Sequence, residues 1–274
     1  MKLATLRIPT GTVAVRVDGD TATELGVPDV GRLLALPDWR ERAERAGGRA
    51  HALADADYAP VVPAPGKILC VGLNYAHHIR EMGRELPEYP TLFAKFTPAL
   101  VGAYDDIVLP SASDAMDWEA ELAVVIGQTV RHATAEEARA AIAGYAVLND
   151  VTARDWQYRS AQWLQGKTFE GTTPFGPVLV TADEVTGGLD LVCEVDGEQV
   201  QAGTTADLVF DPVALVAYIS TVLTLSPGDV IATGTPGGVG HARDPKRYLA
   251  DGSRLVTRIQ GLGECRNVCR AEKR

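Results

Sequence analysis

The sequence lacks the features that define several classes of protein. Four scattered cysteines with no CxxC pair exclude a disulfide framework and give no sign of a zinc site. No stretch approaches the ~18 apolar residues of a membrane helix, and Arg7 and Pro9 interrupt the N-terminal segment before the apolar core of a secretory signal could form. We therefore expect a cytoplasmic protein with no membrane partner.

Basic residues are also in short supply. The chain has 26 Lys and Arg against 36 Asp and Glu, which gives a formal charge of −10 and a pI of about 5.0. This balance opposes binding to nucleic acid, and we expect no nucleic-acid partner. An anionic small molecule would need local positive charge, from a metal ion or from a few well-placed Lys and Arg side chains.

What the chain does have is enough apolar sequence for a large core. Of its 274 residues, 46% are hydrophobic, which suits one large domain with or without a small one. The proline-containing run over 59–66 is typical of a stiff linker. We therefore predict a small N-terminal domain over residues 1–62 and a larger domain over residues 63–274.

The pattern of residues predicts more strands than helices. Alternating polar and apolar residues or short apolar runs indicate strands, while capping residues and proline at a first turn indicate helices. The expected elements are a hairpin over 3–18, a helix over 33–45, strands over 67–72, 117–127, 145–150 and 230–233, a helix capped by Thr134 and Glu137 and closed by Gly144, and a helix from Asp211 to about Leu225. Because strand and helix do not alternate regularly, the prediction is a β-rich α+β fold.

Three acidic residues are candidates for holding a metal ion. Glu119 and Glu121 lie two apart in an apolar strand pattern, so their carboxylates should share one face. Taken alone, the pair is more typical of two solvated acids on an exposed strand face, but Asp150 closes another apolar strand just before a polar turn. Three carboxylates without a matching Cys or His set favour Mg²⁺ or Mn²⁺.

Candidates for proton and carbonyl chemistry lie elsewhere in the chain. His78 and Glu81 are three residues apart, and His77 and Glu81 four apart, so either histidine could pair with the carboxylate on a helical turn. Lys167 lies in a tight, partly aromatic turn, where a lysine can polarise a carbonyl. A surface histidine and a solvated lysine remain open as alternatives.

A glycine-rich loop follows the last expected strand, over residues 234–240. No GK[ST] follows it, so a Walker-type phosphate site is a poor interpretation. Its backbone N–H groups could still cradle a carboxylate, and a purely structural turn is a fair alternative.

Six ordered motifs resemble the fumarylacetoacetate hydrolase family over roughly residues 64–268. They are GLNYAHHIRE from Gly72 to Glu81, FAK from Phe93 to Lys95, DWEAEL from Asp117 to Leu122, NDVTARDWQ from Asn149 to Gln157, GKTF from Gly166 to Phe169 and PGDVIATGTP from Pro227 to Pro236. Modest departures are Trp118, Glu170 and Ser253, at positions where the family commonly has Tyr, Asp and Asp. Residues 1–62 match only loosely the small leading domain of some members.

The resemblance implies a fold and a set of roles. The fold would be the family's mixed β-sandwich or roll, in a homodimer, with Mg²⁺ or Mn²⁺ held by Glu119, Glu121 and Asp150. The base would be His78 rather than His77, paired with Glu81; Lys167 would polarise a carbonyl and Gln157 would face a developing oxyanion. Substrate binding would involve the remaining candidates, which are Gly234 and Thr235 of the glycine-rich loop together with Asn74, Tyr75 and Arg154 of the motifs.

The same resemblance implies chemistry on a small 2-oxo acid. We expect hydrolytic cleavage of a C–C bond in a 2,4-dioxo acid, an acylpyruvate such as fumarylpyruvate or acetylpyruvate, through a metal-stabilised enolate. The alternatives are decarboxylation of oxaloacetate, isomerisation or decarboxylation of unsaturated 2-oxo diacids, and dehydration or hydrolysis of sugar-derived 2-oxo acids. A non-catalytic metal-binding oligomer or a small-molecule sensor is a further alternative from a different functional class.

Overall fold

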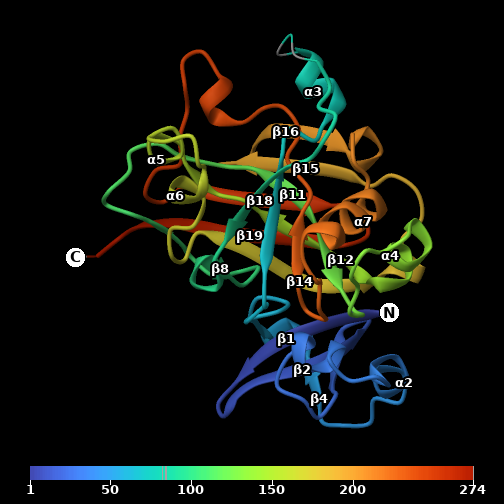
Figure 1. Ribbon diagram of the computed structural model, residues 1–274. Helices are drawn as coiled ribbons and strands as arrows, with labels where there is room; N and C mark the ends of the chain where they lie inside the picture. The colour runs from blue at the N-terminus through green and yellow to red at the C-terminus, as the bar shows by residue number, and fades with distance from the viewer. Residues whose placement is uncertain (82, 84, 274) are drawn as a thin grey trace.

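Strands form most of the framework of the molecule. The computed structural model describes residues 1–81, 83 and 85–273 (Figure 1). The strands are β1 (Lys2–Ile8), β2 (Gly11–Asp18), β3 (Thr21–Glu24), β4 (Ala50–Ala52), β5 (Asp57–Tyr58), β6 (Ile68–Gly72), β7 (Thr91–Lys95), β8 (Leu100–Val101), β9 (Ile107–Leu109), β10 (Met116–Asp117), β11 (Ala120–Ile126), β12 (Ile142–Asn149), β13 (Thr152–Ala153), β14 (Thr173–Thr181), β15 (Asp190–Val195), β16 (Glu198–Thr204), β17 (Val230–Ala232), β18 (Arg254–Ile259) and β19 (Gly263–Ala271). The helices are α1 (Val30–Leu34), α2 (Trp39–Glu44), α3 (Ala76–Glu81), α4 (Ala135–Ala141), α5 (Arg154–Gln157), α6 (Leu164–Lys167) and α7 (Pro212–Val222). The β-rich α+β prediction is therefore confirmed.

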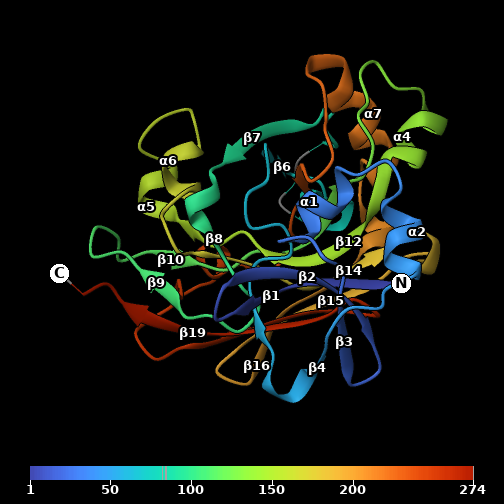
Figure 2. The ribbon, with the colours of Figure 1, turned by 90° about the horizontal axis from the view of Figure 1, so that it is seen from below.

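The strands are organised in one long mixed sheet and a smaller one. The 12-stranded sheet runs in the order β4-β3-β2-β1-β14-β12-β11-β17-β6-β7, with β5 and β8 paired at its sides. The 5-stranded sheet runs β16-β15-β18-β19-β9, and β10 pairs with β13. In Figure 2, β19 and β9 lie side by side, and the adjoining helices α5 and α6 lie on the same flank of the molecule.

The two central strands are buried along their whole length. Every residue of β11 is buried, and so is every residue of β12 except Tyr145. Strands covered on both faces have near-continuous apolar sequences, as the run of β11 has. Helices α4 and α7 pack against one another beside them, and Ala138 and Leu215 share a core cluster with Val124. The closely packed strands β11 and β12 therefore support the acidic residues at and near their ends.

The N-terminal residues extend the long sheet. Leu3 of β1 pairs with Leu179 of β14, and Figure 1 shows this part as a layer along one side of the molecule. The proline-containing run is packed down: Val61 is buried, and its N–H donates to the Phe175 carbonyl at 3.2 Å. The division at residue 62 stays a prediction.

Some expected elements differ in the structure. The hairpin over 3–18 is confirmed as β1 and β2, and the capping box at Thr134 is present. The single helix expected over 33–45 was wrong: the structure has α1 and α2 with Pro37 between them, where proline removes a helical N–H. Gly144 does not close α4 but lies in β12, where an added Cβ would come within 2.1 Å of the Val180 carbonyl oxygen.

The expected strand over 117–127 is also divided. Its first part, β10, ends at Asp117, and β11 begins at Ala120, so Glu119 lies just outside the strand. No helix among the described residues is long and apolar enough to cross a membrane.

Candidate active site and metal centre

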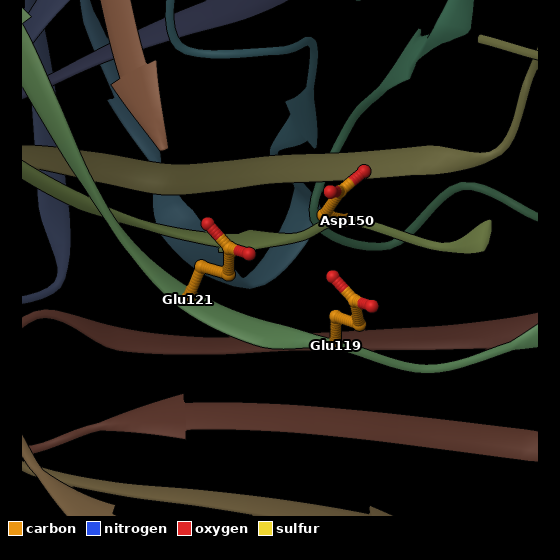
Figure 3. A group of neighbouring side chains, drawn as sticks. All are labelled: Glu119, Glu121 and Asp150. Carbon is orange, nitrogen blue, oxygen red and sulfur yellow. The ribbon is translucent and has the colours of Figure 1, made fainter. Parts of the chain in front are cut away.

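The three predicted ligands meet in one place. Glu119 precedes β11, Glu121 lies within it and Asp150 follows β12, and Ala120 pairs with Asn149 across these two strands. One oxygen from each carboxylate lies within 4.8 Å of the others, and all three residues are buried. Figure 3 shows Glu119 and Glu121 on the same side of their chain segment, near Asp150. Antiparallel pairing therefore brings together acids that are some 30 residues apart in sequence.

Hydrogen bonds hold Glu119 and Asp150, which both lie just outside the regular strands. The Asn149 side-chain oxygen accepts from the Glu119 N–H at 2.9 Å, and the Glu119 carbonyl accepts from the Asp150 N–H at 2.8 Å. The amide nitrogen of Asn149 donates to the Thr257 hydroxyl at 2.8 Å, which links this corner to β18. Asn149 belongs to one of the family motifs but had no predicted role. It holds the backbone of Glu119 in position.

Buried lysines lie against the acids. Lys167 Nζ donates to Glu119 and to Asp150, both at 2.7 Å. Lys95 Nζ donates to the other Asp150 oxygen at 2.6 Å. The sequence predicted a role for Lys167 but none for Lys95, whose only signal was its place in the FAK motif.

Arg154 connects the triad to a fourth buried acid. Its guanidinium bonds Asp117 at 2.8 Å and Glu119 at 2.7 Å, and it donates to the Gln157 side-chain oxygen at 2.9 Å. Asp117 also accepts from the backbone N–H groups of Gly240 at 2.7 Å and His241 at 2.9 Å. Asp117 had no predicted role, and it anchors the glycine-rich loop to the site.

The pKa is shifted in opposite directions in two of the buried carboxylates, Asp150 and Glu121. Burial alone would raise the pKa of Asp150, but the charges and hydrogen bonds of Lys167 and Lys95 outweigh it and lower that pKa. Burial is the largest cause of the raised pKa of Glu121, and the neighbouring Asp150 and Glu119 charges add to it. For Lys167, burial would lower the pKa, yet the Asp150 and Glu119 carboxylates raise it.

The donor set fits a hard divalent cation. The cluster has four buried carboxylates, including Asp117, and three buried cations, which are Lys95, Arg154 and Lys167. An excess of negative charge therefore remains. The raised pKa of Glu121 shows that this acid is the one least compensated by the cations. Oxygen donors of this kind suit Mg²⁺ or Mn²⁺. Glu119, Glu121 and Asp150 are the residues that could hold such an ion.

A cavity of about 320 Å³ opens onto this cluster. It has room for a small organic acid. Its polar lining includes Glu119, Glu121, His78, Arg154, Gln157, Lys167 and Thr235. Phe93 and Trp163 form part of its apolar wall, and their rings meet edge to face at 5.5 Å.

Lys167 reaches the cavity from a tight helix pair. It ends α6, and the preceding Gly166 lies so close to α5 that an added Cβ would come within 2.4 Å of the Gln157 backbone nitrogen. Any larger side chain at 166 would push the two helices apart and move both Lys167 and Gln157.

The two histidines of α3 have different positions. His77 is largely exposed, and its Nδ1 lies 3.4 Å from Glu81. His78 lines the cavity at Glu119 and Glu121, and it also borders a second cavity, of about 530 Å³. A Cβ added to Gly237 would lie 3.1 Å from His78 Nδ1 and 3.4 Å from a Glu81 carboxylate oxygen, so both groups face the same glycine.

The glycine-rich loop contacts the triad directly. Gly234, at φ +100°, directs its N–H to Glu121 at 2.8 Å, and Thr235 donates its hydroxyl to the Ala120 carbonyl at 2.9 Å. Gln201 donates to the Thr235 hydroxyl at 2.8 Å and so fixes its orientation. The N–H expected to cradle a substrate carboxylate instead holds the side chain of Glu121.

Asn74 and Tyr75 are buried and do not line the cavity at Glu119 and Glu121. The Asn74 amide donates to the Phe210 and Thr233 carbonyls, and its oxygen accepts from the Phe210 N–H. Tyr75 is buried and lines the second cavity, and within the described part of the chain its hydroxyl has no hydrogen-bond partner. The exposed Glu81 is likewise outside this cavity and lines the second one, whereas His78, Lys167, Gln157, Arg154 and Thr235 line the cavity with Glu119 and Glu121, and Gly234 contacts Glu121.

Comparison with known proteins agrees with this geometry. The family model described as "Fumarylacetoacetate (FAA) hydrolase C-terminal" matches residues 67–270. The chain belongs to the fumarylacetoacetate hydrolase family. A human relative, oxaloacetate tautomerase FAHD2A, mitochondrial, is 47% identical over 209 residues, which are 75% of this chain and 66% of the relative. The chain thus spans just under two thirds of that relative's length.

Solved structures of the family share the fold along the whole chain. Fumarylacetoacetate hydrolase from Exiguobacterium antarcticum is 33% identical with a TM-score of 0.88, and the match covers 99% of this chain and 100% of that protein. Maleylpyruvate hydrolase from Sphingobium sp. SYK-6, in complex with manganese (II) ion and pyruvate, is 31% identical with a TM-score of 0.83 and full coverage of both chains. These relatives are enzymes, and the acidic triad together with the manganese-containing neighbour indicates a divalent metal in this family member too.

Proposed function

We propose that this protein is a hydrolase that cleaves a C–C bond of a 2,4-dioxo acid, an acylpyruvate such as fumarylpyruvate or acetylpyruvate. The observation that carries the proposal is a cavity of about 320 Å³ whose lining includes Glu119 and Glu121 of the acidic cluster, the buried Lys167 and His78. Glu119, Glu121 and Asp150 would hold Mg²⁺ or Mn²⁺. When bound, that ion supplies positive charge against which a 2-oxo acid can bind and its enolate can form.

Lys167 supplies fixed positive charge beside the reacting carbonyl. Its ammonium is oriented by Glu119 and Asp150, and those carboxylates keep it protonated by raising its pKa. A cation held rigidly in a buried site stabilises developing negative charge far better than a solvated one. Its expected role is to stabilise the departing pyruvate enolate.

Gln157 contributes a neutral donor. Its side-chain oxygen accepts from Arg154, so its amide nitrogen is the end that can donate to a substrate oxygen. This supports a place for Gln157 beside the oxyanion that forms when water adds to the distal carbonyl.

His78 is the proposed base for the attacking water. It lines the cavity at Glu119 and Glu121, and with Glu81 it faces Gly237. A carboxylate near an imidazole raises the basicity of the ring, and the ring then takes a proton from water and later returns it to the enolate carbon. His77 is the weaker choice because it lies on the exposed side of the helix.

A second reaction is favoured by the relatives. The human protein at 47% identity is named an oxaloacetate tautomerase, and tautomerisation needs an enolate and a proton donor but no attack by water. The same lysine and histidine would serve, with Lys167 beside the enolate oxygen and His78 moving the proton.

A substrate panel with Mg²⁺ separates the two reactions. Acetylpyruvate, fumarylpyruvate, oxaloacetate and an unsaturated 2-oxo diacid would be followed by absorbance, with and without EDTA. Release of pyruvate and a second acid from an acylpyruvate, lost on chelation and restored by Mg²⁺ or Mn²⁺, supports the hydrolase. Interconversion of enol and keto oxaloacetate without acylpyruvate cleavage would replace it with the tautomerase, and full activity in EDTA would refute the metal role.

The assembly and the cellular location of the enzyme are also open to test. On the family resemblance we propose a homodimer, and we keep the cytoplasm as the proposed location. The human relative is named as mitochondrial, so location is best tested directly by fractionation, and assembly by light scattering on the purified protein.

A further inference from the structure

Trp163 is a large aromatic residue whose position is not explained by core packing. It lies between α5 and α6, at the N-terminal end of α6, and is half-buried. In the described part of the chain it belongs to none of the three clusters of buried apolar side chains, whereas the nearby Trp156 packs against one of them. Trp163 instead lines the cavity at Glu119 and Glu121.

The indole of Trp163 lies against a glycine of the long sheet. Gly72 ends β6, and a Cβ added there would come within 2.4 Å of one carbon of the six-membered ring and within 2.9 Å of another. The φ of Gly72 lies outside the left-handed region, so the backbone conformation does not require glycine at this position. The close approach of the indole does require it, because any larger residue would displace the ring.

A second aromatic ring connects Trp163 to the lysine at the acidic cluster. Phe93 of β7 meets the Trp163 ring edge to face, with 5.5 Å between the ring centroids. Lys167 Nζ lies 5.0 Å from the centre of the Phe93 ring. The apolar wall formed by the two rings therefore ends beside the ammonium group that the proposed reaction uses.

Contacts on several sides fix the position of this wall. The backbone at Gly72 limits the movement of the indole, and edge-to-face packing holds the two rings against one another. Lys167 is itself held by hydrogen bonds to Glu119 and Asp150. Because closely packed side chains accommodate extra atoms poorly, the wall should limit the size of any ligand group that reaches it.

We propose that Trp163 is a specificity-determining residue, which limits the bulk of the group that a 2-oxo acid carries beyond its 2-oxo carbon. This rests on the proposed function in one respect, that a 2-oxo acid binds in the cavity with its 2-oxo group at the acidic triad and Lys167. The substituent then extends along a cavity of about 320 Å³, in which the indole is the largest apolar side chain of the lining. The selection is by size and needs no charge on the substituent.

Ligands that differ in apolar bulk test the inference. Isothermal titration calorimetry with Mg²⁺ would compare pyruvate with 2-oxo-4-phenylbutanoate, which carry the same charge and lack the 4-oxo group that cleavage requires. We expect the wild-type protein to bind pyruvate more tightly. In Trp163→Ala the affinity ratio should shift toward the phenyl ligand by about tenfold or more, because the space left by the indole admits the phenyl ring. The affinity for oxalate, which lacks any substituent, should change much less.

Two further variants protect the test against misfolding and against non-specific effects. Trp163→Phe keeps an aromatic ring near Gly72, and it should shift the ratio in the same direction by a smaller amount, even if Trp163→Ala does not fold. Trp156→Ala is the matched control, because Trp156 is also half-buried and lies on the adjacent α5 but does not line the cavity. It should leave the ratio unchanged.

The contact between the indole and Gly72 has its own test. Gly72→Ala should lower the free energy of unfolding of the wild-type protein, because the added methyl group clashes with the ring. In the Trp163→Ala background the same substitution should cost much less, since the ring is absent. Urea denaturation of the four proteins measures this coupling, and an equal cost in both backgrounds would contradict the contact.

The outcomes separate this inference from the proposed reaction. An unchanged ligand ratio in the Trp163 variants, or a wild-type protein that binds the phenyl ligand as tightly as pyruvate, would overturn the size limit and leave the hydrolase standing. Loss of oxalate together with both 2-oxo acids in a folded Trp163 variant would also overturn it. A ratio shifted toward the phenyl ligand supports it even if no acylpyruvate is cleaved. Failure of the wild-type protein to bind any 2-oxo acid would overturn both the size limit and the proposed function.

Discussion

The acid and lysine cluster and helix α3 form two parts of the candidate site that differ in burial. The acid and lysine cluster is buried, and both oxygens of Asp150 lie within 2.7 Å of a lysine nitrogen. Helix α3 is six residues long, its Glu81 side chain is 59% exposed and its His77 side chain 78% exposed. Under the proposed function, a rigid, desolvated network would fix the binding geometry, and a solvated edge would supply the proton transfer. Substitutions in the first part should affect folding and activity together, and those in the second activity alone.

Asp150→Asn should have the largest effect. It leaves the buried Lys95 without its carboxylate partner and Lys167 with Glu119 alone, which costs roughly 3–5 kcal/mol in the free energy of unfolding. Mg²⁺ binding and turnover should both disappear. Urea denaturation and calorimetry measure the two effects, with the exposed Asp155→Asn as control. Wild-type stability in Asp150→Asn would contradict the rigid-network half of the comparison.

Lys167→Met should reduce kcat by on the order of 10² or more, because a cation beside the enolate is lost. Stability should fall by less than in Asp150→Asn, since Lys95 still pairs with Asp150 and Arg154 with Glu119. Lys95→Met is the matched variant: it removes another buried cation, but one that does not line the cavity. Equal kcat losses in the two variants would argue against a specific role for Lys167.

Glu121→Gln should stabilise the chelated protein at neutral pH, by about 1–2 kcal/mol, because a buried charge is removed. The folded pKa of Glu121 is raised, so the protonated acid favours folding. Its stabilising contribution is present below about pH 4.3, the value in unfolded chains, and is lost as the pH rises through the folded pKa. The excess stability of the variant should therefore grow with pH in EDTA and shrink when Mg²⁺ is added to both proteins. A destabilised variant in EDTA would reverse this assignment.

His78→Ala should change stability least, by within about 0.5 kcal/mol, because it lies on a short helix at the solvated edge of the site. Activity should still fall by roughly 10²-fold or more if the imidazole moves the proton. His77→Ala is the matched control on the same helix and should retain activity. Loss in His77→Ala with an unchanged rate in His78→Ala would exchange the two assignments.

Local pattern was a good guide where structure is local. The hairpin of β1 and β2, the capping box at Thr134 and the Pro212 start of α7 all follow from residues a few positions apart. Pattern failed at Gly144, which looks like a helix stop but is required by close packing against Val180. It also missed Pro37 as the break between two helices, although that signal was present in the sequence.

The residues of the candidate site likewise include some that the sequence predicted and some that it did not. The acidic triad was predicted because its carboxylates occur at strand ends and within family motifs, and the structure brings all three together. Lys95, Asp117 and His241 were given no role, because a lone lysine, aspartate or histidine is not distinctive in sequence. A substrate role for Asn74 and Tyr75 stays a prediction: Asn74 bonds backbone groups, and Tyr75 lines the second cavity, because motif membership does not distinguish a contact from a support.

The sequence by itself determined the family, the β-rich fold and the oxygen-rich ligand set, because these depend on the order and chemical type of residues. Only the tertiary structure decided which cation balances which acid. Lys95 meets Asp150 across 55 positions, and Gly240 meets Asp117 across 123. Such pairs are set by strand register and loop packing, and in a buried site the charge that lies within 3 Å determines whether an acid is ionised and what it can bind.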